Sequence, residues 1–453
     1  MNCPHWVPLL GLGAIGAALI GLDAAALSLH IPRQLGIGSD ARLQLFVTLM
    51  LIEGLLYAGA VVIVLKAELA RGAVFWIVAI AILMRGLLLV SPPFLSTDMY
   101  RYVWDGMVQD AGINPYRYRP DAPTLAFLRD ARIYAGINRK DTAQTIYPPF
   151  AETIFALAAR ISPTLLAMKA TMTGFDILGI ISLLALLRRA ELPCARILIY
   201  AWHPLTIWEF AGNGHVDAII AGCVALALLG AAYGRPVRSA AAFALAVLAK
   251  LLPAILLPAL WRPRGWRFPV VASVLILAFY ATYAGTGAAV LGFLPGYVHQ
   301  EGITSGSGVF YLQALDRLIP LPPIAGALYL IFALIILAWA GISVWRRDLP
   351  AAPAASTRQL AADAAYLSTA LMILLTPHYA WYFSWLLVPL CIQPRLAMLY
   401  LPTVASLLYL DPIHTRLLWP ALLYGPFAVL ALVSFAWNWR ASRLDLSFKG
   451  GMP

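Results

Sequence analysis

The sequence "STDMYRYVWDGMVQDAGINPYRYRP", residues 96–120, interrupts a chain that is otherwise almost entirely apolar. Of 453 residues, 62% are hydrophobic and only 12% are charged, whereas soluble domains carry roughly 25% charged residues. Apolar runs recur along most of the chain, each near the roughly 20 residues that a helix needs to cross a bilayer. The sequence therefore predicts an all-α polytopic membrane protein that forms a single domain over residues 1–453.

Hydropathy indicates a bundle of about 12 to 14 transmembrane helices. Two of the apolar runs contain groups that are unfavourable in a membrane unless they line a cavity: Lys250 in 239–261, and "TPHYAWY" in 364–393. We expect each of these runs to consist of two short helices that meet near one surface. The candidate spans are residues 7–29, 44–65, 74–91, 165–187, 196–211, 215–233, 239–261, 268–290, 323–345, 364–393, 396–411 and 417–437.

Arginine and lysine residues gather in five short loops and predict the orientation of the chain. By the positive-inside rule these loops face the cytoplasm, and 92–147 and 291–322 are then the two sizeable outer loops. The first outer loop carries seven basic residues, which long translocated loops tolerate; alternatively, its arginines hold a phosphate. The predicted cytoplasmic loops are 66–73, 188–196, 234–238, 262–267 and 346–363.

Several other classes of protein are disfavoured by the sequence. Its four cysteines, Cys3, Cys194, Cys223 and Cys391, are far apart and form no Cys-x-x-Cys pair, so neither a disulfide framework nor a zinc site is expected. The net charge of +11 fits loops that face anionic membrane lipid better than a nucleic-acid partner. The N-terminus lacks a basic segment and a cleavage site, which predicts a retained first helix.

The polar stretch at 96–120 allows two interpretations. Its aromatic residues and charges could form an ordinary interfacial belt. However, Asp98, Arg101 and Asp105 recur at spacings of three and four, which brings them to one face of a helix. An acid at a bilayer surface could deprotonate a hydroxyl group, while the arginine could bind a phosphate or neutralise the acids. The following "TIYPPF", 145–150, predicts a rigid entry into a surface-lying segment at 150–162.

A second polar stretch, "WHPLTIWEFAGNGHVDAII", covers residues 202–220. A turn between two spans explains the glycines and one capping residue, but it does not require Glu209, His215 and Asp217 together. Two potential ligands in His-x-Asp are a weak metal signal, so we favour a hydrogen-bonding site for sugar or phosphate. Lys250 is the only charge in its apolar run, which is typical of a functional group and, at a helix break, of a phosphate partner.

These stretches resemble the polyprenol-phosphate-mannose-dependent mannosyltransferases of the C-type (GT-C) glycosyltransferase superfamily. The resemblance covers about residues 74–261 and is carried by the two stretches above together with "INRKDTAQTIYPPFAE", 137–152, and "LAVLAKLLPAILLPAL", 245–260. It implies a GT-C-type helical bundle with an active site at the outer leaflet, a sugar donor carried on polyprenyl phosphate, and no cofactor. In the family the catalytic loop usually follows the first helix, whereas here two further hydrophobic segments precede it. Either this branch has an N-terminal addition or the first predicted spans are wrong.

The resemblance also implies roles for individual residues. The family's aspartate early in the first outer loop corresponds to Asp98, which would act as general base, with Asp105 as the competing acid. Arg101, Lys250 and His215 would stabilise the leaving phosphate, and no metal site is expected. The candidate substrate-binding residues are Tyr100, Trp104, Asp105, Asn114, Tyr116, Tyr147, His203, Glu209, Asn213, Asp217 and His378.

The favoured function is therefore transfer of a sugar, mannose by resemblance, from a polyprenyl-phosphate donor to a glycolipid or glycan hydroxyl in a bacterial inner membrane. A transporter or flippase of lipid-linked sugars would place its polar groups near the bilayer midplane, often with repeat symmetry, which this sequence lacks. A non-catalytic subunit that holds a glycolipid would tolerate loss of Asp98. Membrane lipid is an expected partner under each hypothesis.

Overall fold

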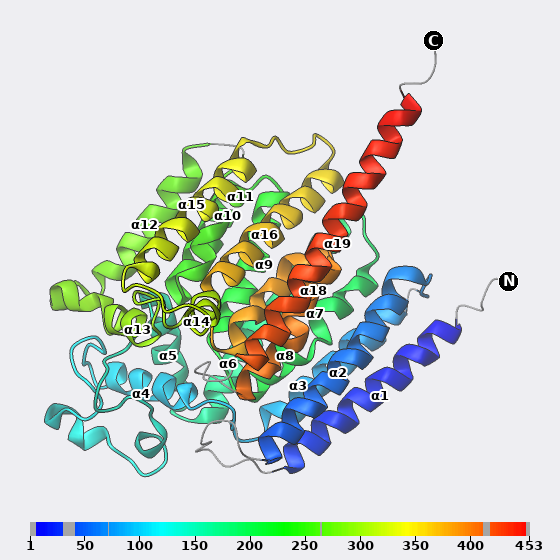
Figure 1. The fold of residues 1–453 in the computed structure, drawn as a ribbon. Helices are drawn as coiled ribbons and strands as arrows, with labels where there is room; N and C mark the ends of the chain where they lie inside the picture. Colours follow the sequence, from blue (N-terminus) through cyan, green and yellow to red (C-terminus); the bar gives the residue numbers. More distant parts are fainter. Residues whose placement is uncertain (1–5, 30–40, 71, 263–264, 411–416, 450–453) are drawn as a thin grey trace.

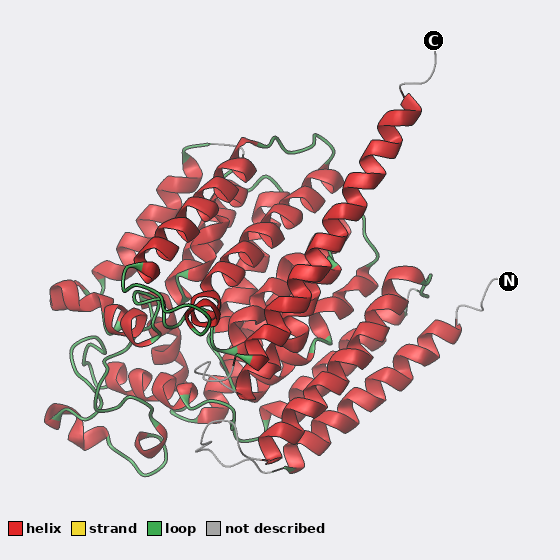
Figure 2. Cartoon of the chain, in the orientation of Figure 1, coloured by secondary structure: helices red, strands yellow, loops and turns green. Residues whose placement is uncertain are grey.

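A computed structural model describes residues 6–29, 41–70, 72–262, 265–410 and 417–449 of the chain. The described residues fold into helices joined by loops and contain no strand (Figure 2). The predicted all-α class is therefore confirmed. Cys3 and Arg264 lie outside the described residues.

The first three helices form an antiparallel group at one side of the bundle (Figure 1). Helix α1 packs against both α2 and α3. Their positions in the sequence agree closely with the first three predicted spans. The bounds are α1 Trp6–Ser28, α2 Ala41–Lys66 and α3 Ala73–Leu89.

The polar loop after α3 folds into short helices. Helix α4, Asp98–Asp110, packs closely on α5, Pro149–Ile161. A Cβ atom at Gly106 would lie 2.4 Å from the Phe155 carbonyl oxygen, so only glycine permits this approach. Two 3₁₀ turns, η1 Pro123–Leu128 and η2 Tyr134–Gly136, complete the loop.

The predicted span 196–211 is not one continuous helix in the structure. Helix α6, Leu165–Arg189, is continuous, but 196–211 is divided into short pieces that continue into α9. Proline restricts the residue before it to extended backbone, and His203 before Pro204 has φ −70° and ψ 123°. The pieces are η3 Cys194–Ile197, α7 Leu198–Ala201, α8 Pro204–Thr206, the π turn η4 Ile207–Gly212, and α9 Asp217–Ala232.

Both predicted helix breaks are confirmed. Helix α10, Pro236–Ala249, ends where Lys250 becomes extended, and the chain returns through η5 Leu252–Leu256 and α11 Leu257–Leu260. The other break follows α16, where Thr376 adopts a left-handed conformation with φ 44°. Helix α16 itself, Pro353–Leu375, begins eleven residues before its predicted start.

The remaining helices complete the bundle. Helix α12 is shorter than the predicted span 268–290, because a 3₁₀ segment with non-helical Gly287 follows it. The bounds are α12 Arg267–Ala281, η6 Ala284–Leu291, α13 Leu294–Gln300, α14 Phe310–Asp316, α15 Ala325–Arg346, η7 Ala380–Leu386, α17 Leu387–Ile392, α18 Leu396–Val404, η8 Ala405–Leu410 and α19 Leu418–Lys449.

Five of the described helices are long and apolar enough to cross a membrane alone: α1, α2, α6, α15 and α19. The pair Pro204–Gly212 and Asp217–Ala232 passes the same test together but is bent by 119°. Five shorter apolar helical segments accompany them. The chain is thus a polytopic membrane protein in which helix breaks shorten many of the predicted spans.

The two ends of the bundle differ in the loops that they gather. The predicted outer loops meet at one end, where the Phe293 N–H donates to the Thr145 carbonyl oxygen at 2.9 Å. The arginine-rich loops meet at the other: Arg358 donates to the Ala190 carbonyl, and Arg262 to the Arg347 carbonyl. Figure 1 shows α4, α13 and α14 at the first end, and the α15–α16 connection at the second.

A buried ion pair that the sequence analysis did not single out joins α3 to α6. Arg85 Nε lies 2.5 Å from Asp176 Oδ2, and both side chains are almost completely buried. Arg85 also donates to the Ala201 carbonyl, and Tyr200 donates to Asp176. These contacts link α3, α6 and α7 through one charged centre.

We predict that Arg85→Met lowers the free energy of unfolding by about 3–5 kcal/mol, because it leaves Asp176 buried without its cation. Thermal unfolding of the purified protein in detergent would measure the loss. The double variant with Asp176→Leu should recover part of it. Arg160→Gln, which removes an exposed pair with Asp110, is the control and should cost less than about 1 kcal/mol. A loss no larger than the control's would contradict a structural role for the buried pair.

Candidate active site

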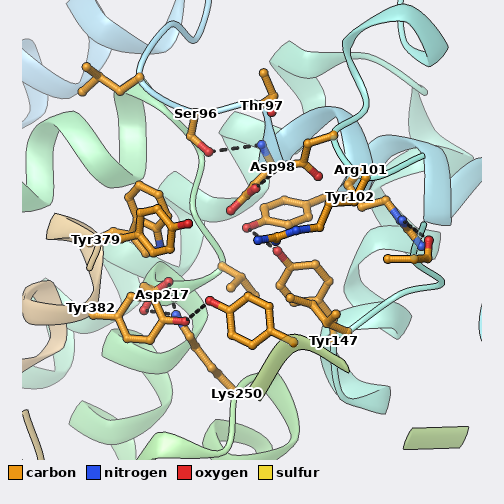
Figure 3. Close-up of a pocket in the computed structure, with 18 of the residues that line it drawn as sticks. Ser96, Thr97, Asp98, Arg101, Tyr102, Tyr147, Asp217, Lys250, Tyr379 and Tyr382 are labelled. Atoms are coloured by element: carbon orange, nitrogen blue, oxygen red, sulfur yellow. Dashed lines mark hydrogen bonds and ion pairs between the residues drawn. The ribbon is translucent and has the colours of Figure 1, made fainter. Parts of the chain in front are cut away.

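A pocket of about 400 Å³ opens at the end of the bundle where the predicted outer loops meet. Segments far apart in the sequence form its walls, including both broken helices. Figure 3 shows Asp98 and the Lys250–Asp217 pair on opposite sides of this pocket. The lining residues are Phe94, Leu95, Ser96, Thr97, Asp98, Arg101, Tyr102, Asn138, Arg139, Ala143, Gln144, Ile146, Tyr147, Val216, Asp217, Lys250, Tyr297, Tyr379, Trp381 and Tyr382.

Asp98 is the first residue of α4 and is half-buried at the pocket wall. Its backbone N–H donates to Ser96 Oγ at 3.1 Å, and its Oδ1 accepts a 2.7 Å hydrogen bond from Asn138 Nδ2. A negative charge is also favourable at a helix N-terminus. The carboxylate is therefore held in one orientation at the edge of a solvent-accessible cavity, as a general base requires.

Asp105 does not line the pocket but lies behind it, fully buried. Both of its carboxylate oxygens are 2.8 Å from Arg101 Nε, and Arg101 Nη1 donates to the Ala143 carbonyl at 3.0 Å. Burial raises the pKa of Asp105, and the Arg101 guanidinium opposes this shift. Arg101 thus reaches the pocket wall while it fixes α4 to the segment that carries Asn138.

Glu152 of α5 completes the polar network behind α4. Thr145 Oγ1 donates to its Oε1 at 2.5 Å, and Gln109 Nε2 donates to its Oε2 at 2.8 Å. Burial raises the pKa of Glu152 well above its usual value, and repulsion from Asp105 raises it further. Burial therefore disfavours the charged form of Glu152, and both of its carboxyl oxygens accept hydrogen bonds from neighbouring side chains.

Lys250 faces Asp98 across the pocket from the broken end of α10. Its Nζ lies 3.0 and 3.2 Å from the two Asp217 oxygens, at the start of α9, and 3.5 Å from the centre of the Tyr382 ring. The sequence analysis proposed Lys250 and Asp217 separately, as phosphate-binding and substrate-binding residues. In the structure they form one ion pair that joins two helix ends.

Arg139 provides a second accessible cation at the pocket. It adopts φ 48° in the first loop, and its Nη2 lies 3.2 Å from Glu301 Oε1, just beyond α13. Glu301 also lies 3.5 Å from His378 Nδ1, while His378 Nε2 donates a hydrogen bond to the Gly308 carbonyl. Glu301 consequently links both predicted outer loops to the second helix break.

Aromatic rings form the wall next to this break. Tyr379 stacks on Trp381 at 4.6 Å with an interplanar angle of 11°, and Tyr297 and Tyr382 share a hydrogen bond between their hydroxyl groups. Burial raises the pKa of Tyr379 to about 12, so its hydroxyl stays protonated at neutral pH. Stacked rings with polar edges suit a ligand with both apolar and hydroxyl-bearing faces, such as a sugar.

Three predicted residues of the second polar stretch lie behind this wall. His215 stacks against the far side of Trp381 at 4.1 Å, and its Nδ1 is 2.8 Å from Glu209 Oε2. Asn213 and Tyr409 also donate to Glu209, so its carboxylate is surrounded by hydrogen-bond donors. The structure does not bring Glu209, Asn213 or His215 to the pocket, and the direct phosphate contact predicted for His215 does not fit this arrangement.

Other predicted residues support the first loop or lie elsewhere. Tyr147 lines the pocket, but Tyr116 is buried and donates from its hydroxyl to the Tyr147 carbonyl. Asn114 accepts from the Tyr116 N–H. His203 is fully buried, contacts Thr403 and Tyr57, and does not line the pocket.

Two further candidates, Tyr100 and Trp104, are packing residues. Tyr100 lies against Gly136, and Trp104 lies against Tyr134. The last candidate, His378, lies outside the pocket wall, beside Glu301.

The sequence analysis missed several lining residues. Asn138 and Arg139 lie in the quoted stretch 137–152 but were not singled out, although the excess of basic residues in this loop pointed to an arginine with a ligand. Tyr102 lies between Tyr100 and Trp104 in the sequence, and both of these were named as candidates. Tyr297, Trp381 and Tyr382 look like ordinary interfacial aromatics in sequence, so only packing distinguishes them. Among the described residues, no three His, Cys, Asp or Glu side chains gather as a metal site would require.

The protein is a membrane-embedded helical bundle, and the pocket at one of its ends holds an accessible acid, Asp98, and two cations, Lys250 and Arg139. Residues 9–262 match the family described as alpha-(1->6)-mannopyranosyltransferase, N-terminal domain. The chain belongs to this family, and it is a mannosyltransferase-type glycosyltransferase of the membrane. Comparisons with curated proteins and with solved structures find no match.

The extent of the family match answers the question of the N-terminal helices. The match begins within α1 and continues through α2 and α3. These helices thus belong to the domain of this family, and the alternative that the first predicted spans are wrong is excluded. The same range includes Asp98, Asn138, Arg139, Asp217 and Lys250, so most of the polar side of the pocket lies in the matched part.

We predict that Glu152→Gln changes the free energy of unfolding by less than about 1 kcal/mol, because burial disfavours the charge that is removed and the amide can accept from Gln109 and donate to Thr145 Oγ1 once that hydroxyl rotates. Glu152→Ala should cost about 2–4 kcal/mol, because it leaves Thr145 and Gln109 without their buried partner. Thermal unfolding in detergent would compare the two variants. Equal losses in both would show that the negative charge of Glu152 is required.

Proposed function

We propose that this protein transfers mannose from a polyprenyl-phosphate donor to a hydroxyl group of a glycolipid or glycan acceptor. The observation that carries this proposal is the half-buried Asp98 carboxylate, oriented by Asn138 and facing a pocket that also contains Lys250 and Arg139. The pocket lies at one end of a bundle of apolar helices. A donor with a lipid tail and a sugar-phosphate head could therefore keep its tail in the membrane while its head enters the pocket.

In the proposed reaction Asp98 removes the proton from the acceptor hydroxyl. The acceptor oxygen forms a bond to the anomeric carbon of mannose as the bond from that carbon to the phosphate oxygen breaks. The electron pair leaves with polyprenyl phosphate, and the proton remains on Asp98 until it passes to solvent or to the released phosphate. Attack opposite the leaving group inverts the anomeric configuration. The family description names an α-(1→6) transferase, and inversion to an α-linked product requires a β-linked donor.

Negative charge develops on the leaving phosphate and is best stabilised by cations already fixed in place. Of the three lining cations, Arg139 has the most exposed side chain at 34%, followed by Lys250 at 17% and Arg101 at 6%. We therefore assign the phosphate to Arg139 and Lys250. Arg101, which the sequence analysis assigned to the leaving phosphate together with Lys250 and His215, is better suited to hold Asp105 and the loop that carries Asn138.

The aromatic wall is assigned to the sugar. Tyr379 and Trp381 present stacked rings to the pocket, and Tyr102, Tyr147 and Tyr297 add hydroxyl groups. Such a wall can contact the apolar face of a hexose and donate hydrogen bonds to its hydroxyls.

We infer that the pocket faces outward from the cytoplasmic membrane. The arginine-rich loops gather at the opposite end of the bundle, and the positive-inside rule assigns such an end to the cytoplasm. A bacterial inner membrane fits this arrangement, with a donor that reaches the outer leaflet and an acceptor in the cell envelope.

We predict that Asp98→Asn lowers mannose transfer by about 100- to 10,000-fold, the usual contribution of a general base. The assay is transfer of labelled mannose from synthetic polyprenyl-phosphate mannose to a membrane extract by purified protein. Asp110→Asn is the matched control, because Asp110 ends the same helix but is exposed. Its activity should equal wild type. Full activity of a folded Asp98→Asn protein would remove Asp98 from this role, whereas a transporter or a binding subunit would show no transfer at all.

We also predict that Arg139→Gln raises the KM for the donor at least tenfold, because it removes a cation from the phosphate site. Lys140→Gln is the control. Lys140 is the next residue in the chain, but its ammonium group lies over the Tyr134 ring and does not line the pocket. Steady-state kinetics with varied donor would separate KM from kcat. An unchanged donor KM in Arg139→Gln would exclude Arg139 from the phosphate site and leave Lys250 as the candidate.

A further inference from the structure

A second cavity, of about 990 Å³, lies at the end of the bundle opposite the candidate active site. It is formed by the last turns of α15, the first half of α16, the α17–α18 connection and α19. Its residues are distinct from those of the first pocket. They are Trp339, Ser343, Arg347, Gln359, Ala362, Asp363, Ala365, Tyr366, Gln393, Arg395, Leu396, Ala397, Met398, Phe427, Ala431, Val433 and Ser434.

Two walls of this groove come from helices that face the lipid. Only 22% of the apolar stretch of α15 and 17% of that of α19 is buried by the rest of the protein. These are the lowest values among the five described helices that are long enough to span a membrane. In Figure 1, α16 lies between these two helices. Trp339 on α15 and Val433 on α19 are largely exposed although they line the groove. The groove therefore opens sideways toward the membrane interior.

The end of the groove near the membrane surface is polar and positively charged. Asp363 is buried and receives two arginines, Arg262 and Arg347, each at 2.7 Å, as well as Gln359 at 2.9 Å. One carboxylate thus faces two guanidinium groups. Arg347 remains half exposed at 50%, and Arg395 is exposed and forms no ion pair among the described residues. The groove carries a net positive charge at its mouth.

Apolar walls below a cationic mouth match the two parts of an anionic lipid. Basic pockets between transmembrane helices on the arginine-rich side of a membrane bind acidic head groups, and burial of acyl chains along apolar walls adds a hydrophobic contribution. The volume of about 990 Å³ is at the upper end of the range of small-molecule sites, about 300–1,000 Å³. A transmembrane helix of another protein would fill the apolar part but would leave Arg395 without an anion.

We propose that this groove binds an anionic phospholipid, with its phosphate between Arg347 and Arg395 and its acyl chains between α15 and α19. The site is independent of the proposed mannosyl transfer, since it shares no residue with the pocket around Asp98. Bound lipid would bridge α15–α16 to α18–α19 and so hold the C-terminal helices in place.

The test uses the full-length protein in detergent, with native mass spectrometry and added phosphatidylglycerol or phosphatidylcholine. We expect the wild-type protein to retain phosphatidylglycerol at least tenfold more tightly than phosphatidylcholine. Arg395→Gln should remove most of this preference. Arg346→Gln is the matched control, because Arg346 is an exposed neighbour that does not line the groove, and it should behave as wild type.

A second variant tests the groove without altering its charge. Ala431→Phe fills the space between the walls while both arginines remain, and it should also lower phosphatidylglycerol retention at least tenfold. Equal retention of the two lipids by the wild-type protein, or equal loss in Arg346→Gln and Arg395→Gln, would overturn the proposal. Density for a protein helix in the groove, in a structure solved by electron microscopy, would overturn it in favour of a partner subunit.

Discussion

The ion pair between Lys250 and Asp217 joins the two helix ends on which the pocket depends. A lone lysine or aspartate inside an apolar bundle is unfavourable, and each needs the other as a partner within hydrogen-bond distance. Lys250 ends α10 and Asp217 begins α9, so their pairing fixes two interrupted helices against each other. The exposed backbone groups at these ends are tolerated because they line a cavity and do not face lipid.

Around this pair, the polar groups of the chain are arranged in layers of different accessibility. Asp98, Asn138 and Arg139 line the pocket, whereas Asp105, Glu152 and Glu209 are buried behind it and surrounded by donors. The inner layer carries little exposed charge and holds the outer layer in position. The same division explains why neighbouring acids of α4 differ: Asp98 begins the helix at the cavity, while Asp105 lies two turns further along, against Arg101.

Much of the architecture follows from local properties of the sequence. The apolar runs predicted an all-helical membrane protein, and the charge of Lys250 and the polar "TPHYAWY" predicted two helix breaks that the structure contains. Asp98 was selected because it stands where an apolar run meets a polar loop. By contrast, 196–211 was predicted as one span although Pro204 divides it, and the sequence did not reveal that Arg85 finds Asp176 on a neighbouring helix.

The sequence alone determined three features of this protein: its hydropathy, its helix-breaking residues and the position of an acid beside an apolar run. Each of them depends only on residues that are adjacent in the chain. Which polar side chains share a cavity was decided only by the tertiary structure. Arg139 meets Glu301 across 162 positions of sequence, and His215 is separated from the pocket by the ring of Trp381. Such relations depend on how distant helices pack, and the energy of a buried charge depends on the partner that packing supplies. No pattern of neighbouring residues encodes either quantity.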